Sequence, residues 1–170
     1  MLDLKPLVHA VLSEYALPRD GTHGIAHWAR VLENGLRLAE HTNVSADVVQ
    51  LFALFHDSRR INEGVDPGQG KRGAELAASF RGKWFTLADR DFDLLYEACV
   101  RHTDGDTEGD VALQTCWDAD RLDLGRVGIR PNHIKLCTKA AKLPEILNWA
   151  DGRAQLRVQP EIVVETWNIR

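Results

Sequence analysis

The chain has 170 residues, 44% of them hydrophobic and 27% charged, a composition typical of one globular domain with its own core. Acidic residues outnumber basic ones by 25 to 21, so the net charge is −4 and we expect no binding to duplex nucleic acid. No apolar run approaches the roughly 18 residues of a membrane span, and no secretory signal stands out. Three cysteines without CxxC spacing fit the reducing cytosol, so we expect a cytoplasmic protein that does not bind membranes.

Helical periodicity runs through nearly the whole sequence, and no repeat or linker divides it. Helices are predicted, in chain order, over residues 4–15, 22–41, 45–60, 74–80, 86–102, 111–124 and 131–149. Glycines and a proline within residues 62–73 predict a loop. Strand-like alternation is confined to residues 159–169, which would form an edge strand or a packed tail. The sequence therefore predicts one all-α domain over residues 1–170, a helical bundle with a short irregular C-terminal tail.

The second and third predicted helices carry polar residues on faces that should be buried. His27 shares a stripe with Val31 and Leu38, and the third helix is apolar nearly all round before it delivers His56 and Asp57. A carboxylate is costly there, because burial and the C-terminal end of the helix dipole both disfavour negative charge. We therefore expect a positive partner beside Asp57.

Two further helices repeat this pattern downstream. His102 lies on one face with Leu95 and Cys99, and Asp120 shares a face with apolar residues of the next helix. Asp118 lies about 200° around that helix from Asp120, so only one of the two aspartates can point squarely at the core. The pattern favours Asp120.

Four predicted helices thus place a histidine or an aspartate on an inward face. Any one of these residues is readily explained as a hydrogen-bonded core histidine or a salt-bridged aspartate, but such explanations are less plausible for all four helices together. Two imidazoles and two carboxylates form a mixed nitrogen and oxygen shell that suits one divalent metal ion. Positions left open on such an ion can take water and substrate.

Three segments carry these residues in a fixed order across residues 22–128. They are His23-Gly-Ile-Ala-His27-Trp-Ala-Arg-Val31, then Leu54-Phe-His56-Asp57, then Asp118-Ala-Asp120-Arg-Leu-Asp123. The ordered set resembles the HD-domain superfamily of metal-dependent phosphohydrolases, although the His-Asp dipeptide alone carries little information. The resemblance implies an HD-type helical domain in which His27, His56, Asp57 and Asp120 hold the metal.

The chain departs from some members of that superfamily. Relatives with a second metal have two further histidines, of which His102 fills one position while Gln69 stands at the other. We therefore expect one divalent ion, which could be Mn, Fe, Co, Ni, Zn or Mg. Arg59 and Arg60 replace the Glu-Asp pair of alarmone hydrolases, so hydrolysis of guanosine tetraphosphate is not specifically implied.

The resemblance implies an enzyme that cleaves a phosphate monoester or diester of a small molecule, by family analogy a nucleotide, with a water that the metal activates. The expected partner is this small phosphorylated substrate, and the chain is expected to be a monomer or a homodimer. The candidate catalytic residues are Asp57, His102 and Arg59. The candidate substrate-binding residues are His23, Arg60, Lys71 and Arg72, because arginine and lysine stabilise phosphoryl oxygens.

Several of these roles have alternatives. The basic residues could form a solvated cluster, and the loop over residues 62–73 could be a lid or a passive connector. His102 could contact the phosphate or leaving group, act as a fifth ligand, or sit in the core. As a whole, the chain could instead be a non-catalytic metal-containing sensor or ligand-binding module. An HD-fold iron oxygenase or lyase is a further alternative, which Gln69 disfavours because such enzymes usually need two irons.

Overall fold

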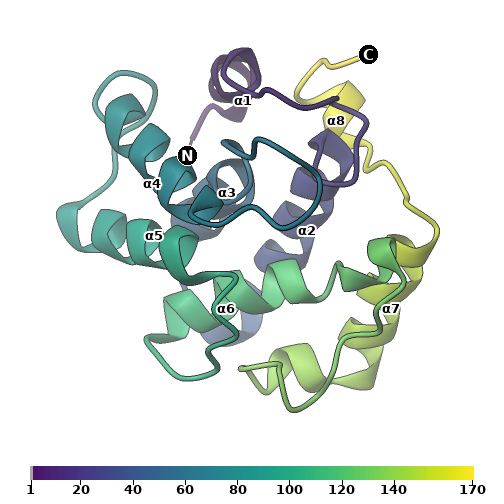
Figure 1. Ribbon diagram of the computed structural model, residues 1–170. Helices are drawn as coiled ribbons and strands as arrows, with labels where there is room; N and C mark the ends of the chain where they lie inside the picture. Colours follow the sequence, from purple (N-terminus) through teal and green to yellow (C-terminus); the bar gives the residue numbers. More distant parts are fainter. Residues whose placement is uncertain (1) are drawn as a thin grey trace.

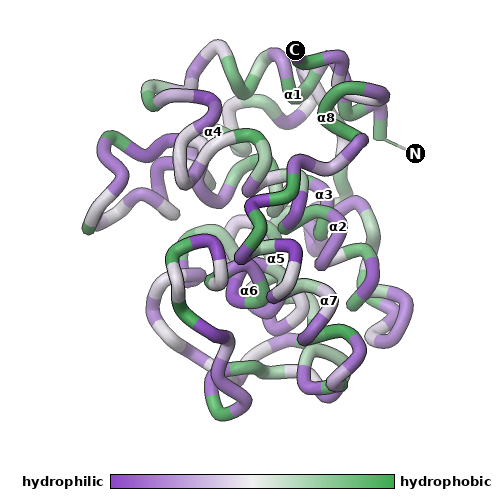
Figure 2. The backbone as a smooth tube through the Cα atoms, turned by 90° about the vertical axis from the view of Figure 1, so that its right-hand side faces the viewer, coloured by the Kyte–Doolittle hydropathy of each residue, from purple (hydrophilic) through white to green (hydrophobic). Residues whose placement is uncertain are grey.

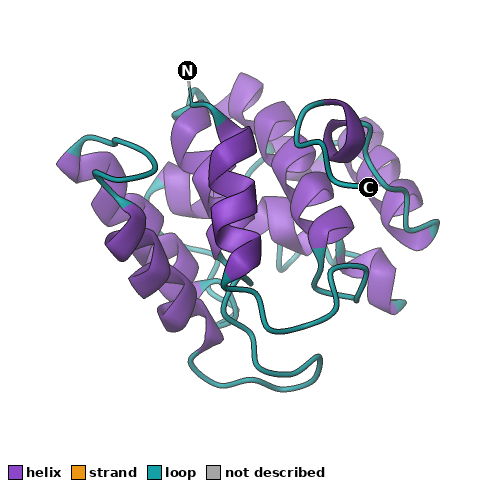
Figure 3. Cartoon of the chain, turned by 90° about the horizontal axis from the view of Figure 1, so that it is seen from above, coloured by secondary structure: helices purple, strands orange, loops and turns teal. Residues whose placement is uncertain are grey.

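The computed structural model describes residues 2–170, and all regular secondary structure in that range is helical (Figure 1, Figure 3). The helices are α1 (Leu4–Ser13), α2 (Ile25–Thr42), α3 (Ala46–Phe55), α4 (Gln69–Phe80), α5 (Asp89–Arg101), α6 (Val111–Arg121), the 3₁₀ helices η1 (Leu124–Val127) and η2 (Ala140–Lys142), α7 (Pro144–Gln155) and α8 (Ile162–Glu165). The β-type pairing found within residues 2–170 is an isolated bridge between Arg81 and Phe85. The prediction of an all-α helical bundle is confirmed.

The apolar helix α3 occupies the centre of the bundle. Seven of its ten residues are buried, and it packs against α1, α2, α4, α5 and α6. A helix that is apolar nearly all round needs cover on every side, which explains this position. Hydrophilic and hydrophobic residues alternate along the outer helices, as the colours of the tube show (Figure 2). The residues that follow α3 are therefore delivered from the middle of the core.

Two glycines allow α4 to lie against the ends of α3 and α5. A Cβ atom at Gly73 would lie 2.1 Å from the carbonyl oxygen of Phe55, and one at Gly70 would lie 2.1 Å from that of Cys99. Any side chain at these positions would push the helices apart. The two contacts fix the first turn of α4, and with it Gln69, beside the segment that follows α3.

Several helix boundaries differ from the prediction. The loop predicted over residues 62–73 is shorter, because α4 begins at Gln69 directly after Gly68, whose φ of 78° favours glycine. Residues 56–59 form turns after α3 instead of prolonging it. The helix predicted to reach residue 124 ends at Arg121 and is followed by η1.

The helix predicted over residues 131–149 is wrong in its first half. Residues 131–139 are irregular, and the backbone N–H groups of Cys137 and Thr138 donate to the side chain of Asp118. Those groups are thereby satisfied without an intrahelical partner. A regular helix starts only at Pro144, a residue well suited to a first helical turn, and continues to Gln155.

The C-terminal segment forms a packed tail, as one of the two alternatives proposed. It contains the short helix α8 and no strand, so it is less irregular than expected. Val163, Trp167 and Ile169 are buried against the common core. No helix within residues 2–170 combines the length and the apolar character needed to cross a membrane.

Candidate metal centre

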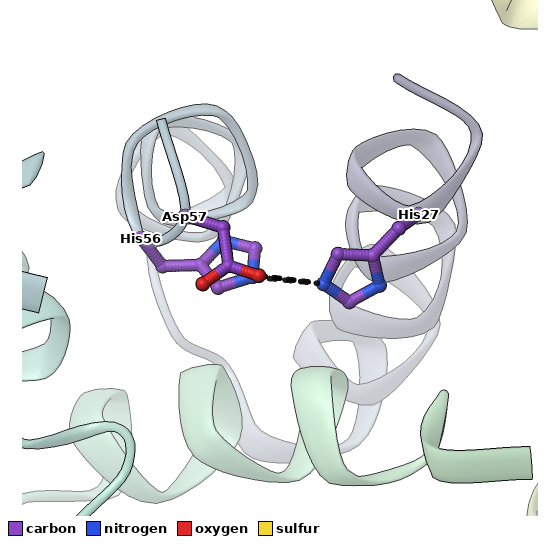
Figure 4. Close-up of side chains that lie close together, drawn as sticks. All are labelled: His27, His56 and Asp57. Atoms are coloured by element: carbon purple, nitrogen blue, oxygen red, sulfur yellow. Dashed lines mark hydrogen bonds and ion pairs between the residues drawn. The ribbon is translucent and has the colours of Figure 1, made fainter. Parts of the chain in front are cut away.

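Two histidines and an aspartate from separate helices converge in the core. His27 lies in the first turn of α2, whereas His56 and Asp57 directly follow α3, and Figure 4 shows their side chains pointing toward one another. The two Nε2 atoms of His27 and His56 lie 3.1 Å apart. Asp57 Oδ2 lies 3.4 Å from the former and 3.6 Å from the latter. This spacing allows all three side chains to bind one metal ion.

Asp120, in the last turn of α6, faces the same point from the other side. Its Oδ1 lies 3.5 Å from Nε2 of His27 and 3.7 Å from Nε2 of His56. The Asp120 side chain is 19% exposed, whereas those of the two histidines are fully buried and that of Asp57 is 3% exposed. Asp120 therefore marks the side on which solvent or a substrate can approach.

The protons of both imidazoles are directed away from this point. Nδ1 of His56 donates to the carbonyl oxygen of Phe52, at 3.0 Å, and Nδ1 of His27 donates to the carboxylate of Asp123, at 2.7 Å. Burial lowers the pKa of His56 to about 4, so this ring is neutral at neutral pH and its Nε2 carries a lone pair. His27 also directs Nε2 toward this point, because its Nδ1 is hydrogen-bonded to the Asp123 carboxylate.

The converging atoms are therefore hydrogen-bond acceptors. Burial alone would raise the pKa of Asp57, but the neighbouring imidazoles, with His56 foremost, outweigh it and hold the pKa well below its ordinary value. One oxygen of Asp57, Oδ1, is buried without a hydrogen-bond partner among the described residues. Imidazole nitrogens and carboxylate oxygens facing one another need a cation between them. The residues fit a divalent metal ion.

Asp123 orients His27, a role that the sequence did not suggest. It is fully buried and also accepts from Arg30, with Nε at 2.6 Å and Nη2 at 3.1 Å. Burial would raise the pKa of Asp123, but His27 and Arg30 hold it below its usual range. Such a carboxylate fixes the ring and makes the ligating nitrogen more basic. The sequence feature that could have predicted this role is the position of Asp123 three residues after Asp120, a spacing that puts two side chains on one face of a helical turn.

His102 reaches the centre from the C-terminal end of α5. Its Nε2 lies 3.5 Å from Asp57 Oδ1, and its Nδ1 donates to the carbonyl oxygen of Cys99 at 2.7 Å. The side-chain nitrogen of Gln69 lies 2.9 Å from the same Nε2. Burial would lower the pKa of His102, but the Asp57 carboxylate raises it overall. The imidazole is thus aimed at Asp57 and steadied by Gln69.

Arg60 is the positive partner expected beside Asp57. Its Nη1 lies 3.5 Å from Asp57 Oδ1, and its side chain is 8% exposed. The guanidinium also donates to the backbone carbonyl oxygens of Asn62 and Gly64, which follow it in the chain. Arg60 therefore joins the metal centre to the loop over residues 61–68.

Arg59 and Lys71 lie away from the centre. Nη1 of Arg59 donates to the backbone and side chain of Glu14, at the end of α1, at 3.0 and 3.1 Å. Lys71 is exposed and lies 3.9 Å from Glu75 on its own helix. The turn after α3 and the first turn of α4 direct these side chains outward, so the structure does not bring them to the metal ligands.

Arg72, in the first turn of α4, binds the loop over residues 61–68 instead. Its guanidinium contacts Asp66 at 2.5 Å and donates to the carbonyl oxygens of Arg59 and Pro67. The four basic residues Arg59, Arg60, Lys71 and Arg72 therefore do not form one cluster, and only Arg60 contacts Asp57 directly. Their closeness in the sequence suggested one basic cluster, but the side chains of neighbouring residues in a turn or helix point in different directions.

His23 lies beside the centre and contacts the same loop. Its Nδ1 lies 2.5 Å from the Glu63 carboxylate, and its ring centroid lies 6.2 Å from that of His27. Burial lowers the pKa of His23. This pair fastens the loop over residues 61–68 to the start of α2.

Asp118 and Asp120 are both engaged inside the protein, on different sides of α6. Asp118 is fully buried and accepts from the backbone amides of Cys137 and Thr138, at 2.8 and 2.7 Å, and from the Thr138 hydroxyl at 2.8 Å. Burial raises its pKa. The sequence predicted that only one of the two can point squarely at the core, and it did not anticipate residues 131–139, which cover the side of α6 that carries Asp118.

Comparisons with protein-family models, curated proteins and solved structures found no match to this chain. The assignment of the site therefore rests on its own geometry. That geometry defines an all-α bundle with a buried cluster of two histidines and an aspartate that can bind a metal ion.

Proposed function

We propose that this protein is a metal-dependent phosphohydrolase that cleaves a phosphate ester of a small molecule at the centre formed by His27, His56, Asp57 and Asp120. The observation that carries the proposal is the convergence of these four side chains, of which Asp120 is partly exposed. The proposal also places the chain in the HD-domain superfamily, whose ordered motifs it resembles. A divalent ion held there supplies a Lewis acid for a phosphoryl oxygen and makes water a better nucleophile near neutral pH.

The side chains around the centre have separate tasks in this proposal. Arg60 lies beside Asp57 and places positive charge where negative charge grows on the phosphoryl oxygens. His102 directs Nε2 toward the same carboxylate, which suits it to hydrogen-bond the phosphoryl group or the leaving oxygen. Asp123 and Arg30 keep the His27 ring in one orientation. A nucleotide substrate remains a proposal by analogy with the superfamily.

The test joins metal analysis to a substrate panel. We expect about one divalent ion per chain, and phosphate or alcohol release from at least one of p-nitrophenyl phosphate, bis-p-nitrophenyl phosphate, nucleoside monophosphates and cyclic nucleotides. Asp57→Ala and Asp120→Ala should lose both metal and activity. Asp93→Ala, which alters an exposed aspartate on α5, should keep both. Turnover that survives in Asp57→Ala would disprove the assignment.

A non-catalytic sensor is the second candidate, and one observation favours it. Arg59, Lys71 and Arg72 are bound elsewhere, which leaves few cations at the metal centre for a phosphate ester. A sensor would bind metal and a ligand and would gain thermal stability from the ligand without forming product. The same panel, read by thermal shift and by product analysis, separates the two functions.

A further inference from the structure

A cavity of about 300 Å³ lies beside the first turns of α2, next to the metal centre. His27 belongs to its wall, but the other three proposed metal ligands and His102 do not. The cavity is lined by the turn before α2 and the first turns of α2, by η1, by the segment that follows α7 and by the C-terminal tail. Its volume suits a small molecule.

Positive charge dominates this cavity. Five arginines line it, against one acidic side chain, that of Asp20; the arginines are Arg19, Arg30, Arg126, Arg157 and Arg170. Asp123 neutralises Arg30 and lies 3.7 Å from Arg126, but the remaining three arginines form no ion pair with any residue in the range 2–170. Five arginines at one cavity of an acidic protein favour an anionic ligand.

The arginine side of the cavity is held in place by hydrogen bonds. Arg157 has a left-handed backbone with a φ of 48°, which is uncommon outside glycine, and its Nη2 donates to the carbonyl oxygen of Arg126 at 3.1 Å. Arg30 donates to the carbonyl oxygen of Val158 at 2.8 Å and so ties the same segment to α2. Arg126 donates through Nε to the carbonyl oxygen of Thr22. The guanidinium groups are thus partly preorganised.

Besides the arginines, Asp20, Thr22, His27 and Gln159, the wall is aliphatic or glycine, and it contains no Phe, Tyr or Trp. Ile25, Val163 and Ile169 are largely buried and line the cavity, together with Ala26. The wall therefore offers no Phe, Tyr or Trp on which a nucleobase could stack. Aliphatic side chains of this kind favour a short aliphatic chain instead.

We propose that this cavity is a second ligand site, which binds a small organic anion with a phosphate or carboxylate head and a short aliphatic chain. The head lies among Arg19, Arg126 and Arg157, and the chain lies against Ile25 and Val163. The site does not depend on the proposed phosphohydrolase activity, because none of these residues is a proposed metal ligand.

Calorimetric titration of the metal-free protein tests the site directly. The probes are butyl phosphate and pentanoate, which separate the two head groups, with inorganic phosphate and butanol as partial ligands. We expect saturable binding of at least one amphipathic anion, about tenfold or more tighter than inorganic phosphate, because the buried methylene groups add affinity. Butanol should not bind. Failure of both amphipathic anions to bind, or equal affinity for inorganic phosphate, would overturn the proposal.

Variants locate the binding. Arg19→Gln and Arg157→Gln change exposed arginines and should each weaken binding about tenfold or more, through loss of a charge-assisted contact. Arg90→Gln, at an exposed arginine of α5 outside this cavity, is the matched control and should leave the affinity unchanged. Asp120→Asn removes a proposed metal ligand and should retain binding. Equal losses in Arg90→Gln, or loss in Asp120→Asn, would place the ligand elsewhere and refute the second site.

Discussion

Asp120 and Asp123 stand three residues apart and have different tasks. Asp120 is partly exposed and faces the Nε2 atoms of two histidines, whereas Asp123 is fully buried between His27 and Arg30. Because the charge of Asp123 is already balanced by Arg30, that residue can orient a ligand without being one. The same type of side chain is thus a proposed metal ligand in one place and a fixed hydrogen-bond acceptor in the other.

This difference predicts that substitution of Asp123 lowers metal affinity less than substitution of Asp120 does. Asp123→Asn should weaken metal affinity about 10- to 100-fold, because His27 loses the acceptor that fixes its ring. Asp120→Asn should abolish stoichiometric binding. Titration with Mn²⁺ or Zn²⁺ measures both, with Asp93→Asn as the exposed control. Equal affinities in Asp123→Asn and the wild type would remove the orienting role.

Asp118 gives a prediction about stability. Asp118→Ala leaves the amides of Cys137 and Thr138 and the Thr138 hydroxyl without their buried acceptor, so the free energy of unfolding should fall by about 3 kcal/mol or more. Urea unfolding in the presence of EDTA measures this loss independently of metal. A loss no larger than that of Asp93→Ala would show that residues 131–139 do not depend on Asp118.

At the scale of elements, the loop over residues 61–68 lies between α3 and α4 in the chain, is mostly exposed, and contacts His23 and Arg60 beside the candidate metal centre. Arg60 binds it at one end, the pair of Asp66 and Arg72 at the other, and the pair of His23 and Glu63 in between. These contacts are polar and local to the loop, so its stability depends on charge more than on buried apolar surface.

Asp66 makes the stability of this loop dependent on pH. Burial would raise its pKa, but the Ile61 amide and Arg72 lower the pKa overall. Because the folded pKa lies below the unfolded one, the stabilising effect is present above the ordinary aspartate pKa of 3.8 and is lost as the pH falls through the folded value.

Asp66→Asn should therefore lower the free energy of unfolding by about 2 kcal/mol at pH 7, the size of a charge-assisted hydrogen bond. The difference from the wild type should shrink as the pH falls below 3.8. Urea unfolding of both proteins between pH 7 and pH 3 checks this. A difference that stays constant over that range would contradict it.

At the scale of the whole molecule, the metal centre exists only in the folded chain. His27 lies in the first turn of α2, His56 and Asp57 follow α3, and Asp120 lies in the last turn of α6. The proposed ligands are far apart in the sequence and meet through packing of three helices. A metal that binds this arrangement and not the unfolded chain must stabilise the fold.

Metal removal should therefore lower the melting temperature. An ion present at about 100 times its Kd contributes about 2.7 kcal/mol. For a domain of this size, that corresponds to roughly 5–10 °C. Thermal unfolding with EDTA and with excess metal measures the shift, and Asp120→Asn should show none. An equal shift in Asp120→Asn would mean that the metal binds elsewhere.

The sequence predicted which side chains point into the core better than it predicted the contacts of surface side chains and irregular segments. The faces of the helices select His27, His56, Asp57 and Asp120, because the helical period decides what points inward. The direction of Arg59 could not be predicted in this way, because its partner Glu14 is brought near only by the fold. The irregular stretch over residues 131–139 was missed for the same reason, since the side chain that binds it comes from α6.

The imidazole of His27 lies between the candidate metal centre and the arginine-lined cavity. One nitrogen faces the metal ligands, and the other is hydrogen-bonded to Asp123, whose partner Arg30 forms part of the arginine-lined cavity. An anion bound at Arg126, whose Nη1 lies 3.7 Å from Asp123, would make Asp123 more basic and so would alter how strongly His27 binds a cation. Linkage makes this exchange reciprocal, so that occupancy at either place shifts the dissociation constant at the other by the same factor. The His27 ring would then couple the binding of a cation on one side to the binding of an anion on the other.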